Sequence, residues 1–209
     1  MNSIWIPIII IGAVGFLCVL LPFLLVWRSQ IQRYQQERTE LAERYGFTVK
    51  RGNWNTISLY GNYRNFPIVI KNYQASWPYT KRFKLQFELT IKNPQTVKMR
   101  AFFGEGDSCD FLPLLVQEQN NFYGKMRLCG EPKSFLLDFI FSSQVKKGIK
   151  KAIGRTYKIM GQVSLVLEGD QLIFEQLERS LWSSNESYIQ YMMDWLVDCA
   201  EKLDEVMAS

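Results

Sequence analysis

The chain opens with an apolar stretch that constrains what the rest can fold into. From Ile4 to Trp27 the sequence has 24 positions and no charged side chain. As a helix this stretch covers about 36 Å, at about 1.5 Å per residue, and a hydrocarbon core is about 30 Å thick. A helix also satisfies its own backbone hydrogen bonds in lipid. The sequence therefore predicts a transmembrane anchor over residues 1–27.

The residues at the ends of this stretch favour a retained anchor over a cleaved signal peptide. Trp5 and Trp27 stand at the two ends, where indole rings favour the headgroup region, and Arg28 follows directly. Pro22 is expected to kink the last third of the helix. Residues 1–3 include no Lys or Arg, whereas a signal peptide has a basic start and a shorter apolar core. We expect Trp5, Pro22, Trp27 and Arg28 to belong to the anchor.

Basic residues are concentrated on one side of the apolar stretch. None precedes it, and four arginines follow it closely, at Arg28, Arg33, Arg38 and Arg44. The positive-inside rule then predicts that the N-terminus lies outside and that the C-terminal part is cytoplasmic, at a plasma membrane or another internal bacterial membrane. In that compartment the cysteines are expected to be reduced thiols.

The spacing of apolar residues changes from a helical to a strand period near Phe47. Residues 28–46 have a helical spacing that ends at Gly46, which predicts a juxtamembrane helix. Residues 162–168 and 171–177 flank Gly169–Asp170 as a hairpin would. Other strands are expected at 56–60, 66–71, 83–91, 97–102 and 135–141, with turns at Gly61–Asn62 and elsewhere. Helices are expected at 143–160 and 184–207, the latter capped by Ser184 or Ser187, and residues 104–130 are expected to be mostly loop.

Together these elements predict an α+β protein, with one N-terminal transmembrane helix followed by a soluble domain. In that domain an antiparallel β-sheet packs against two or more helices. The expected organisation is an anchor at 1–27, a juxtamembrane helix at 28–46 and a cytosolic α+β domain at 47–209. About 180 residues are enough for one domain with its own core.

A local basic segment is the most distinctive feature of the predicted domain. The chain has a net charge of +5, and residues 141–160 contribute six basic side chains and no acidic one. At 100° per residue the apolar residues of this helix fall on one side and the basic residues on the other. The basic residues are Lys146, Lys147, Lys150, Lys151, Arg155 and Lys158. This face is expected to contact a protein partner or anionic lipid headgroups; a solvated face, or docking against the acidic last helix, are the alternatives.

Residues that could carry catalysis or bind metal are sparse. The chain has no histidine, which excludes His-based triads and His-ligated zinc, and its four cysteines form no CxxC pair. Ser143 and Lys146 match the S-x-x-K spacing, but the motifs that accompany it in penicillin-binding proteins are missing. Glu105, Asp107 and Asp110 crowd one segment without the spacing of a calcium loop. We expect no catalytic residue, no metal and no cofactor.

Several short motifs resemble those of a group of uncharacterised bacterial membrane-anchored proteins. Leu41-Ala-Glu-Arg-Tyr-Gly-Phe47, Gly61-Asn-Tyr-Arg64 and Ile68-Val-Ile70 resemble an opening of the form LA..GF followed by G.YR...V. Gly130 to Phe135 and Glu168-Gly-Asp170 stand where that group has a GDPxFDxxF element and a strand pair around Gly-Asp. Leu136 replaces the Asp of the F-D pair. The resemblance covers residues 41 to 205 and implies a shared fold, but no activity and no site residues.

The function expected from these features is that of a single-pass, non-enzymatic interaction or assembly protein. Its cytosolic domain would contact a membrane-protein complex, and the bilayer would raise the local concentration of the two partners. The alternatives are a membrane-bound hydrolase or transferase acting on lipid or envelope substrates, and a peripheral module that binds anionic lipid. Nucleic acid is disfavoured as a partner, because the basic segment has no interleaved aromatic stacking platform.

Overall fold

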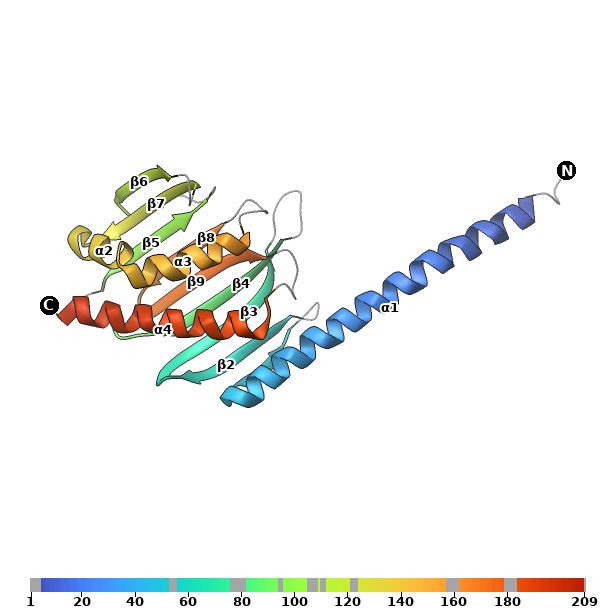
Figure 1. Ribbon diagram of the computed structural model, residues 1–209, viewed down its shortest axis with the longest axis horizontal. Coiled ribbons are helices and arrows are strands. Elements are labelled where there is room, and N and C mark those ends of the chain that lie inside the picture. The colour runs from blue at the N-terminus through green and yellow to red at the C-terminus, as the bar shows by residue number, and fades with distance from the viewer. Residues whose placement is uncertain are drawn as a thin grey trace.

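The protein is an α+β fold built on one large antiparallel sheet (Figure 1). The computed structural model describes residues 5–52, 56–75, 82–93, 96–104, 109, 112–120, 124–156, 162–178 and 184–208. Its helices are α1 (Trp5–Tyr45), α2 (Lys133–Ile140), α3 (Ser143–Thr156) and α4 (Glu186–Ala208). Its strands are β1 (Thr48–Arg51), β2 (Ile57–Tyr63), β3 (Phe66–Ala75), β4 (Arg82–Thr90), β5 (Lys98–Phe103), β6 (Leu114–Asn120), β7 (Gly124–Glu131), β8 (Val163–Glu168) and β9 (Gln171–Glu178).

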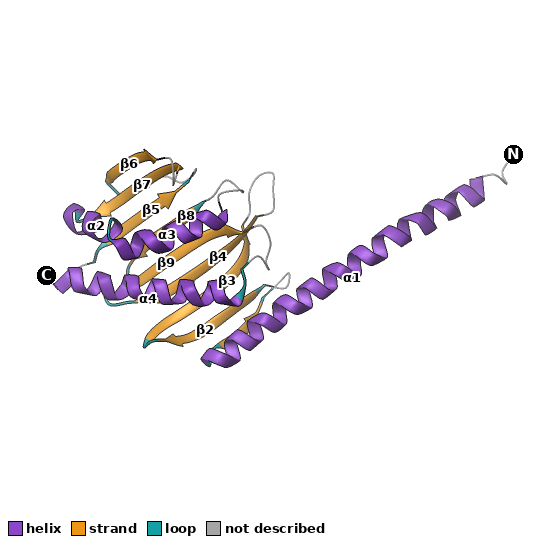
Figure 2. Ribbon diagram, viewed as in Figure 1, coloured by secondary structure: helices purple, strands orange, loops and turns teal. Residues whose placement is uncertain are grey.

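The nine described strands follow the order β1-β2-β3-β4-β9-β8-β5-β7-β6, and each neighbouring pair is antiparallel. Helices α2, α3 and α4 cover one face of this sheet, whereas α1 packs beside β1 and β2 and then projects far beyond the domain (Figure 2). The expected α+β class, with an antiparallel sheet packed against two or more helices, is therefore confirmed.

Strand β4 shows why the sheet has one helix-covered face. Its apolar and polar residues alternate, and Leu85, Phe87 and Leu89 are fully buried under the helices. The intervening polar residues occupy the opposite face. The buried rings form a continuous cluster, because Phe174 lies 6.1 Å from Phe87 and 5.2 Å from Trp195 of α4, ring centre to ring centre. This aromatic cluster joins the centre of the sheet to α4.

Two of the predicted turns lie within the described residues, and they had different outcomes; those expected at Trp77–Pro78 and Asn93–Pro94 include residues outside the described part of the chain. The β8–β9 hairpin turns at Gly169, whose φ of +56° suits glycine, so that prediction is confirmed. The turn expected at Gly61–Asn62 is wrong: both residues belong to β2, and the chain turns at Arg64 and Asn65, which both have positive φ as a two-residue hairpin requires. Gly61 is needed for space instead, since a Cβ there would lie 2.2 Å from the Phe47 ring.

Residues 135–141 were expected to be a strand and are mostly helix α2. The buried residues Phe135, Leu136, Phe139 and Ile140 form a helical stripe, and Pro132 immediately precedes the helix. The strand prediction is therefore wrong, because the apolar residues of this short run follow the helical period instead of the strand period. Residues 104–130 were expected to be mostly loop, but they include β6 and β7, which complete one end of the sheet. These two strands have few β-branched residues, so the sequence pattern missed them.

Helix α4 begins two residues later than expected and has a different cap. The backbone N–H of Tyr188 donates to Asn185 Oδ1 at 3.1 Å, so Asn185 caps the helix, rather than Ser184 or Ser187. The hydroxyl of Ser184 donates to Glu178 instead. Ser184 is therefore part of a buried polar cluster, described below.

Helix α1 is continuous through the predicted anchor and the predicted juxtamembrane helix. It includes Pro22 and ends at Tyr45, where Gly46 adopts a φ of +68°. Over the residues that the structure describes, no helix combines the length and the apolar character needed to cross a membrane.

Candidate functional site

The junction between α1 and the rest of the protein contains a buried cluster of polar side chains. The last turns of α1 belong to the core: Tyr34, Leu41 and Ala42 are almost completely buried. Arg38 lies on the same face of the helix and is only 4% exposed. A buried arginine needs partners for its donors, because an isolated buried charge is costly.

Arg38 meets a cluster of polar side chains from β9 and α4. Its Nη2 donates to the backbone oxygen of Ser184 at 3.1 Å, and its guanidinium lies 5.1 Å from the centre of the Tyr34 ring. The Ser184 hydroxyl and the Gln176 amide both donate to Glu178, and the Tyr188 hydroxyl donates to Gln176. The cluster thus joins α1, β9 and the start of α4 in one hydrogen-bonded network.

Burial decides the ionisation of this cluster. It raises the pKa of Glu178, although Ser184, Gln176, Arg155 and Arg38 oppose the shift. It also lowers the pKa of Arg38, and Tyr34 and Glu178 act in the opposite direction. The arginine stays charged at any ordinary pH, because its starting value is so high. The arrangement fixes the orientation of α1 against the domain.

The acidic face of α4 provides a second set of contacts beside this cluster. Glu186 pairs with Arg44 of α1, and Asp194 accepts from Tyr63 at 2.7 Å and from Arg64 at 2.8 Å. Burial and the Asp194 carboxylate raise the pKa of Tyr63 to about 12. These acidic residues of α4 therefore engage α1 and the β2–β3 turn rather than the basic helix.

The basic residues predicted as a contact surface lie on α3, whose outer face they form. Lys146, Lys147, Lys150, Lys151 and Arg155 are exposed, and Lys158 lies outside the described residues. Three of them sit over aromatic rings: Lys151 Nζ is 3.4 Å from the centre of the Tyr191 ring, Arg155 is 3.9 Å from that of Tyr188, and Lys146 is 4.9 Å from that of Phe141.

Helix α3 contacts α4 through close packing as well as through these rings. The indole of Trp195 lies against the backbone of Gly148, and its Nε1 donates to the Gln144 oxygen at 2.9 Å. A Cβ on Gly148 would lie only 2.1 Å from the Trp195 ring. The basic face is thereby held on a rigid support and points away from the core.

Of the predicted anchor residues, Trp27 and Arg28 are exposed on α1, and Pro22 lies within the helix. Trp5 is the first helical residue. Trp27 lies 6.3 Å from Phe23, ring centre to ring centre.

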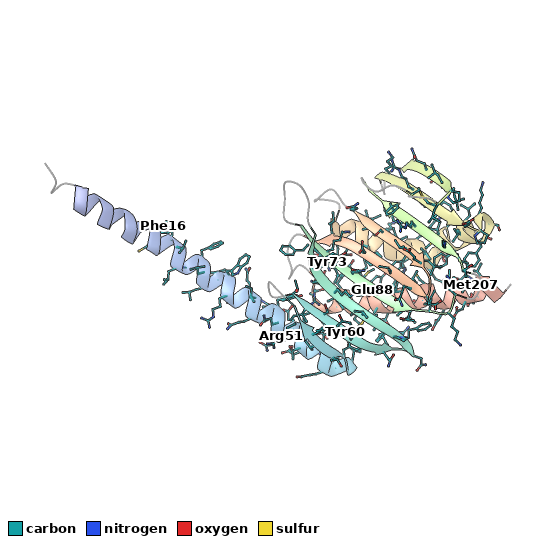
Figure 3. The ribbon with its side chains drawn as sticks, turned by 180° about the vertical axis from the view of Figure 1, so that it is seen from behind. Phe16, Arg51, Tyr60, Tyr73, Glu88 and Met207 are labelled. Atoms are coloured by element: carbon teal, nitrogen blue, oxygen red, sulfur yellow. A yellow bond between two sulfur atoms is a disulfide. The ribbon has the colours of Figure 1, made fainter. Side chains whose placement is uncertain are left out.

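The second face of the sheet is open and carries cross-strand ion pairs that the sequence did not predict. Seen from behind, this face has no helix over it, and Tyr60, Tyr73 and Glu88 stand on it (Figure 3). Lys71 pairs with Glu88 at 2.6 Å. Glu175 accepts from Tyr73 at 2.8 Å and pairs with Lys84 at 3.1 Å. Burial, followed by the Glu175 carboxylate, raises the pKa of Tyr73.

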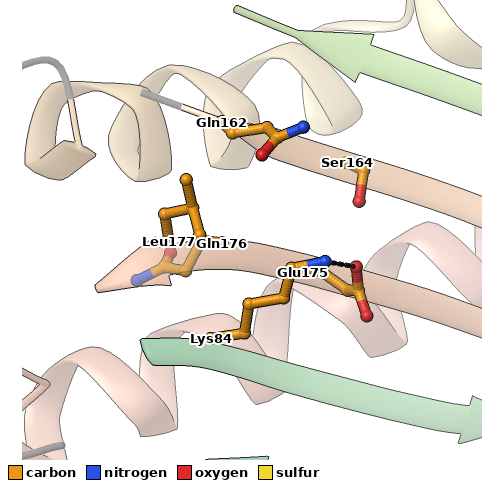
Figure 4. A pocket seen from close by; sticks show the side chains of 6 residues that line it. All are labelled: Lys84, Gln162, Ser164, Glu175, Gln176 and Leu177. Atoms are coloured by element: carbon orange, nitrogen blue, oxygen red, sulfur yellow. Dashed lines mark hydrogen bonds and ion pairs between the residues drawn. The ribbon is translucent and has the colours of Figure 1, made fainter. Parts of the chain in front are cut away.

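A small hollow opens beside the Lys84–Glu175 pair (Figure 4). Its volume of about 10 Å³ is the space of one water molecule, which is too small for a substrate. The alternation of β4 places Lys84 and Glu88 on its polar side. Their partners on β3 and β9 depend on the strand register, which the sequence pattern does not give.

Among the described residues, the side chains considered for catalysis or metal binding do not come together in a site. Ser143 is the first residue of α3, the neighbouring Ser142 hydroxyl accepts from the Val145 N–H at 3.4 Å, and the Lys146 ammonium sits over Phe141. Among described residues there is no group of three or more potential metal ligands. Glu105, Asp107 and Asp110 lie outside them.

A disulfide is the one covalent feature that differs from expectation. Cys109 is joined to Cys129 of β7, with their Cα atoms 5.7 Å apart. Reduced thiols had been expected for both. Cys18 and Cys199 are free. The bond attaches Cys109 to the sheet at β7.

Comparisons of the chain with protein-family models and with curated proteins, and of its fold with solved structures, find no match.

Proposed function

We propose that this chain is a single-pass membrane protein whose α+β domain is held rigidly near the bilayer, where it serves as a non-enzymatic contact for a membrane-protein complex. The observation that supports this most directly is the continuity of α1. One helix of 41 residues includes the apolar stretch at its start and core residues of the domain at its end.

The membrane anchor is supported by what α1 exposes beyond the domain. Large apolar side chains are exposed on several sides of the helix, at Phe16, Val19, Leu21, Phe23, Leu24, Leu25, Val26 and Trp27. Burial of such surface is worth about 25 cal/mol per Å², and large exposed apolar patches mark membrane or protein contacts. In the sequence the apolar stretch begins at Ile4 and includes no charged residue before Arg28.

A rigid tether gives the domain a defined height and orientation. From Trp27 to Arg38 the helix advances 11 residues, or about 16 Å. Because Arg38 and its neighbours are locked in the core, no flexible linker separates the anchor from the domain. A partner in the same membrane would then meet one fixed face, which makes even a weak contact effective.

Two observations bear on the side of the membrane, and they favour opposite answers. The four arginines after the apolar stretch favour the cytoplasm, whereas a disulfide is typical of an oxidising compartment. We propose the cytoplasmic side, because flanking charge acts while the helix inserts, before the domain has folded. Protease added to intact cells should then spare a C-terminal epitope tag, and digestion of the tagged domain would reverse the assignment.

Mild-detergent co-purification from membranes, followed by mass spectrometry, tests the functional proposal. We expect one abundant membrane complex with the wild-type chain, and recovery of the chain alone would contradict the proposal. A Gly-Ser insertion after Gln30 should leave the chain in the membrane fraction and release the complex. The matched control is an insertion of two helical turns at the same place, which keeps the helix rigid. Equal recovery from the Gly-Ser variant would contradict the rigid tether.

A peripheral lipid-binding role is the second candidate, and the exposed basic face of α3 favours it. Each Lys or Arg near an anionic surface is worth about 1 kcal/mol, but the effect falls off within a Debye length of about 8–10 Å. Arg155 sits over Tyr188 in the first turn of α4, and both Arg155 and Arg38 act on the Glu178 carboxylate. Arg38 is about 16 Å along α1 from Trp27. This distance favours a protein partner over direct headgroup contact.

A further inference from the structure

Strand β6 forms an open edge of the sheet. It is the last strand in the order, it pairs only with β7, and no other described segment pairs with its outer side. Alternate residues of such a strand direct their N–H and C=O groups outwards, where they template a further strand. The opposite edge is different, because α1 packs beside β1.

The same strand carries an exposed apolar residue and borders a hollow. Outside α1, Leu114 is the only large hydrophobic side chain that is exposed in the described part of the chain, at 53%. On the helix side, a hollow of about 290 Å³ lies between the end of the sheet and α3. Its apolar wall consists of Phe103, Met126, Ile140, Phe141 and Ile149.

Charged groups stand around this hollow without ion-pair partners among the described residues. Glu118 of β6 and Lys146 of α3 both line it, and Lys147 is exposed next to Lys146. The α3 side is therefore basic. The volume is at the lower limit for a small-molecule pocket, and it suits one or two side chains entering from a neighbouring strand.

We propose that β6 and the adjoining hollow bind an extended segment of another protein, which adds to the sheet as a tenth strand. Its main chain would pair with the outer edge of β6, the side chains on its helix-facing side would be apolar and would enter the hollow, and an acidic residue would face Lys146 and Lys147. Strand addition of this kind obtains affinity from main-chain hydrogen bonds and specificity from the pockets for alternate side chains.

A second copy of this chain is disfavoured as the occupant. In Figure 1, α1 runs in roughly the same direction as the strands. Antiparallel pairing of β6 with β6 of another copy would therefore point the two α1 helices in opposite directions. One membrane cannot accept both. This step rests on the proposed anchor, whereas the open edge, the hollow and the lysines do not.

Panning of a random dodecapeptide library against the full-length chain in detergent micelles tests the proposal. We expect enrichment of sequences in which apolar and polar residues alternate and which include Asp or Glu. The double variant Lys146→Glu, Lys147→Glu should weaken binding of an enriched peptide by about tenfold or more, since like charges would then face each other. Lys50→Glu on β1 is the matched control and should leave binding unchanged.

The edge itself is tested by Gln117→Pro, which should abolish binding, and circular dichroism checks that the variant is folded. Slower amide exchange in β6 when the peptide is bound gives an independent measure. The proposal is overturned by no enrichment, by sequences without alternation, by equal binding to the charge-reversed variant, or by a β6-linked dimer of this chain. Peptide binding without a co-purifying complex would contradict the proposed function and leave this inference standing.

Discussion

The two glycines of α3 allow one substitution to be made twice on the same helix, with opposite expected effects. Gly148 and Gly154 both lower the intrinsic stability of the helix, by about 1 kcal/mol each relative to Ala. Gly154 is exposed, and a Cβ there meets nothing within 4 Å. Gly154→Ala should therefore stabilise the protein by about 1 kcal/mol.

Gly148→Ala should destabilise it. The new methyl would lie 2.1–2.2 Å from three atoms of the Trp195 ring. That ring is held by Gln144 and by an edge contact with Phe174, so it has little freedom to move. Overpacking of this kind costs about 1–3 kcal/mol, and the clash is severe, so we expect a net loss of about 2 kcal/mol after the gain in helix propensity.

Urea unfolding of both variants, followed by circular dichroism, would measure the difference. We expect the two variants to differ by about 3 kcal/mol, with wild type between them. Equal midpoints for the two variants would show that α3 does not pack on Trp195 at Gly148. A stabilised Gly148→Ala would refute the packing argument outright.

Three further predictions concern the junction and the disulfide. Arg38→Ala should cost about 3–5 kcal/mol in urea unfolding, because it removes the buried donor to the Ser184 oxygen and one of the two cationic groups that act on the buried Glu178. Arg33→Ala at the solvent-exposed Arg33 should stay within about 0.5 kcal/mol. Burial raises the pKa of Glu178, so its contribution to stability is complete below the ordinary value of 4.5 and is lost as the pH rises through the raised pKa. Thermal melts over that range should therefore fall less steeply for Glu178→Gln than for wild type; parallel curves would contradict the shift. Cys109→Ser should lower the stability of the oxidised protein by about 3 kcal/mol, as expected for the 20-residue separation from Cys129, and should have little effect under dithiothreitol.

Much of the fold followed from local patterns. The alternation in β4 and the Gly169 turn of β8–β9 were readable because one face of each strand is buried and the turn needs a positive φ. The basic face of α3 was likewise visible, since its apolar residues follow the helical period. Strands β6 and β7 were missed because their residues have weak strand propensity, and they exist through pairing with β5 rather than through their own pattern.

Some of the candidate sites could likewise be predicted from the sequence, and one could not. The basic residues of α3 and the apolar stretch of α1 were found from charge and hydropathy alone. The cluster around Arg38 was not, because Arg38 was counted with the flanking arginines and nothing in its local sequence marks it as buried. Its partners come from positions more than a hundred residues away, such as Ser184.

The sequence by itself determined the class of the fold, the faces of β4 and α3, and the long uncharged start of the chain. Those properties depend on the spacing of residue types within one segment, which is visible in the sequence. Only the tertiary structure decided that α1 continues into the core, that Arg38 is locked to β9 and α4, and that β6 is left as an open edge. Each of these depends on which distant segments become neighbours, and the burial of a side chain is a property of that assembly rather than of the side chain.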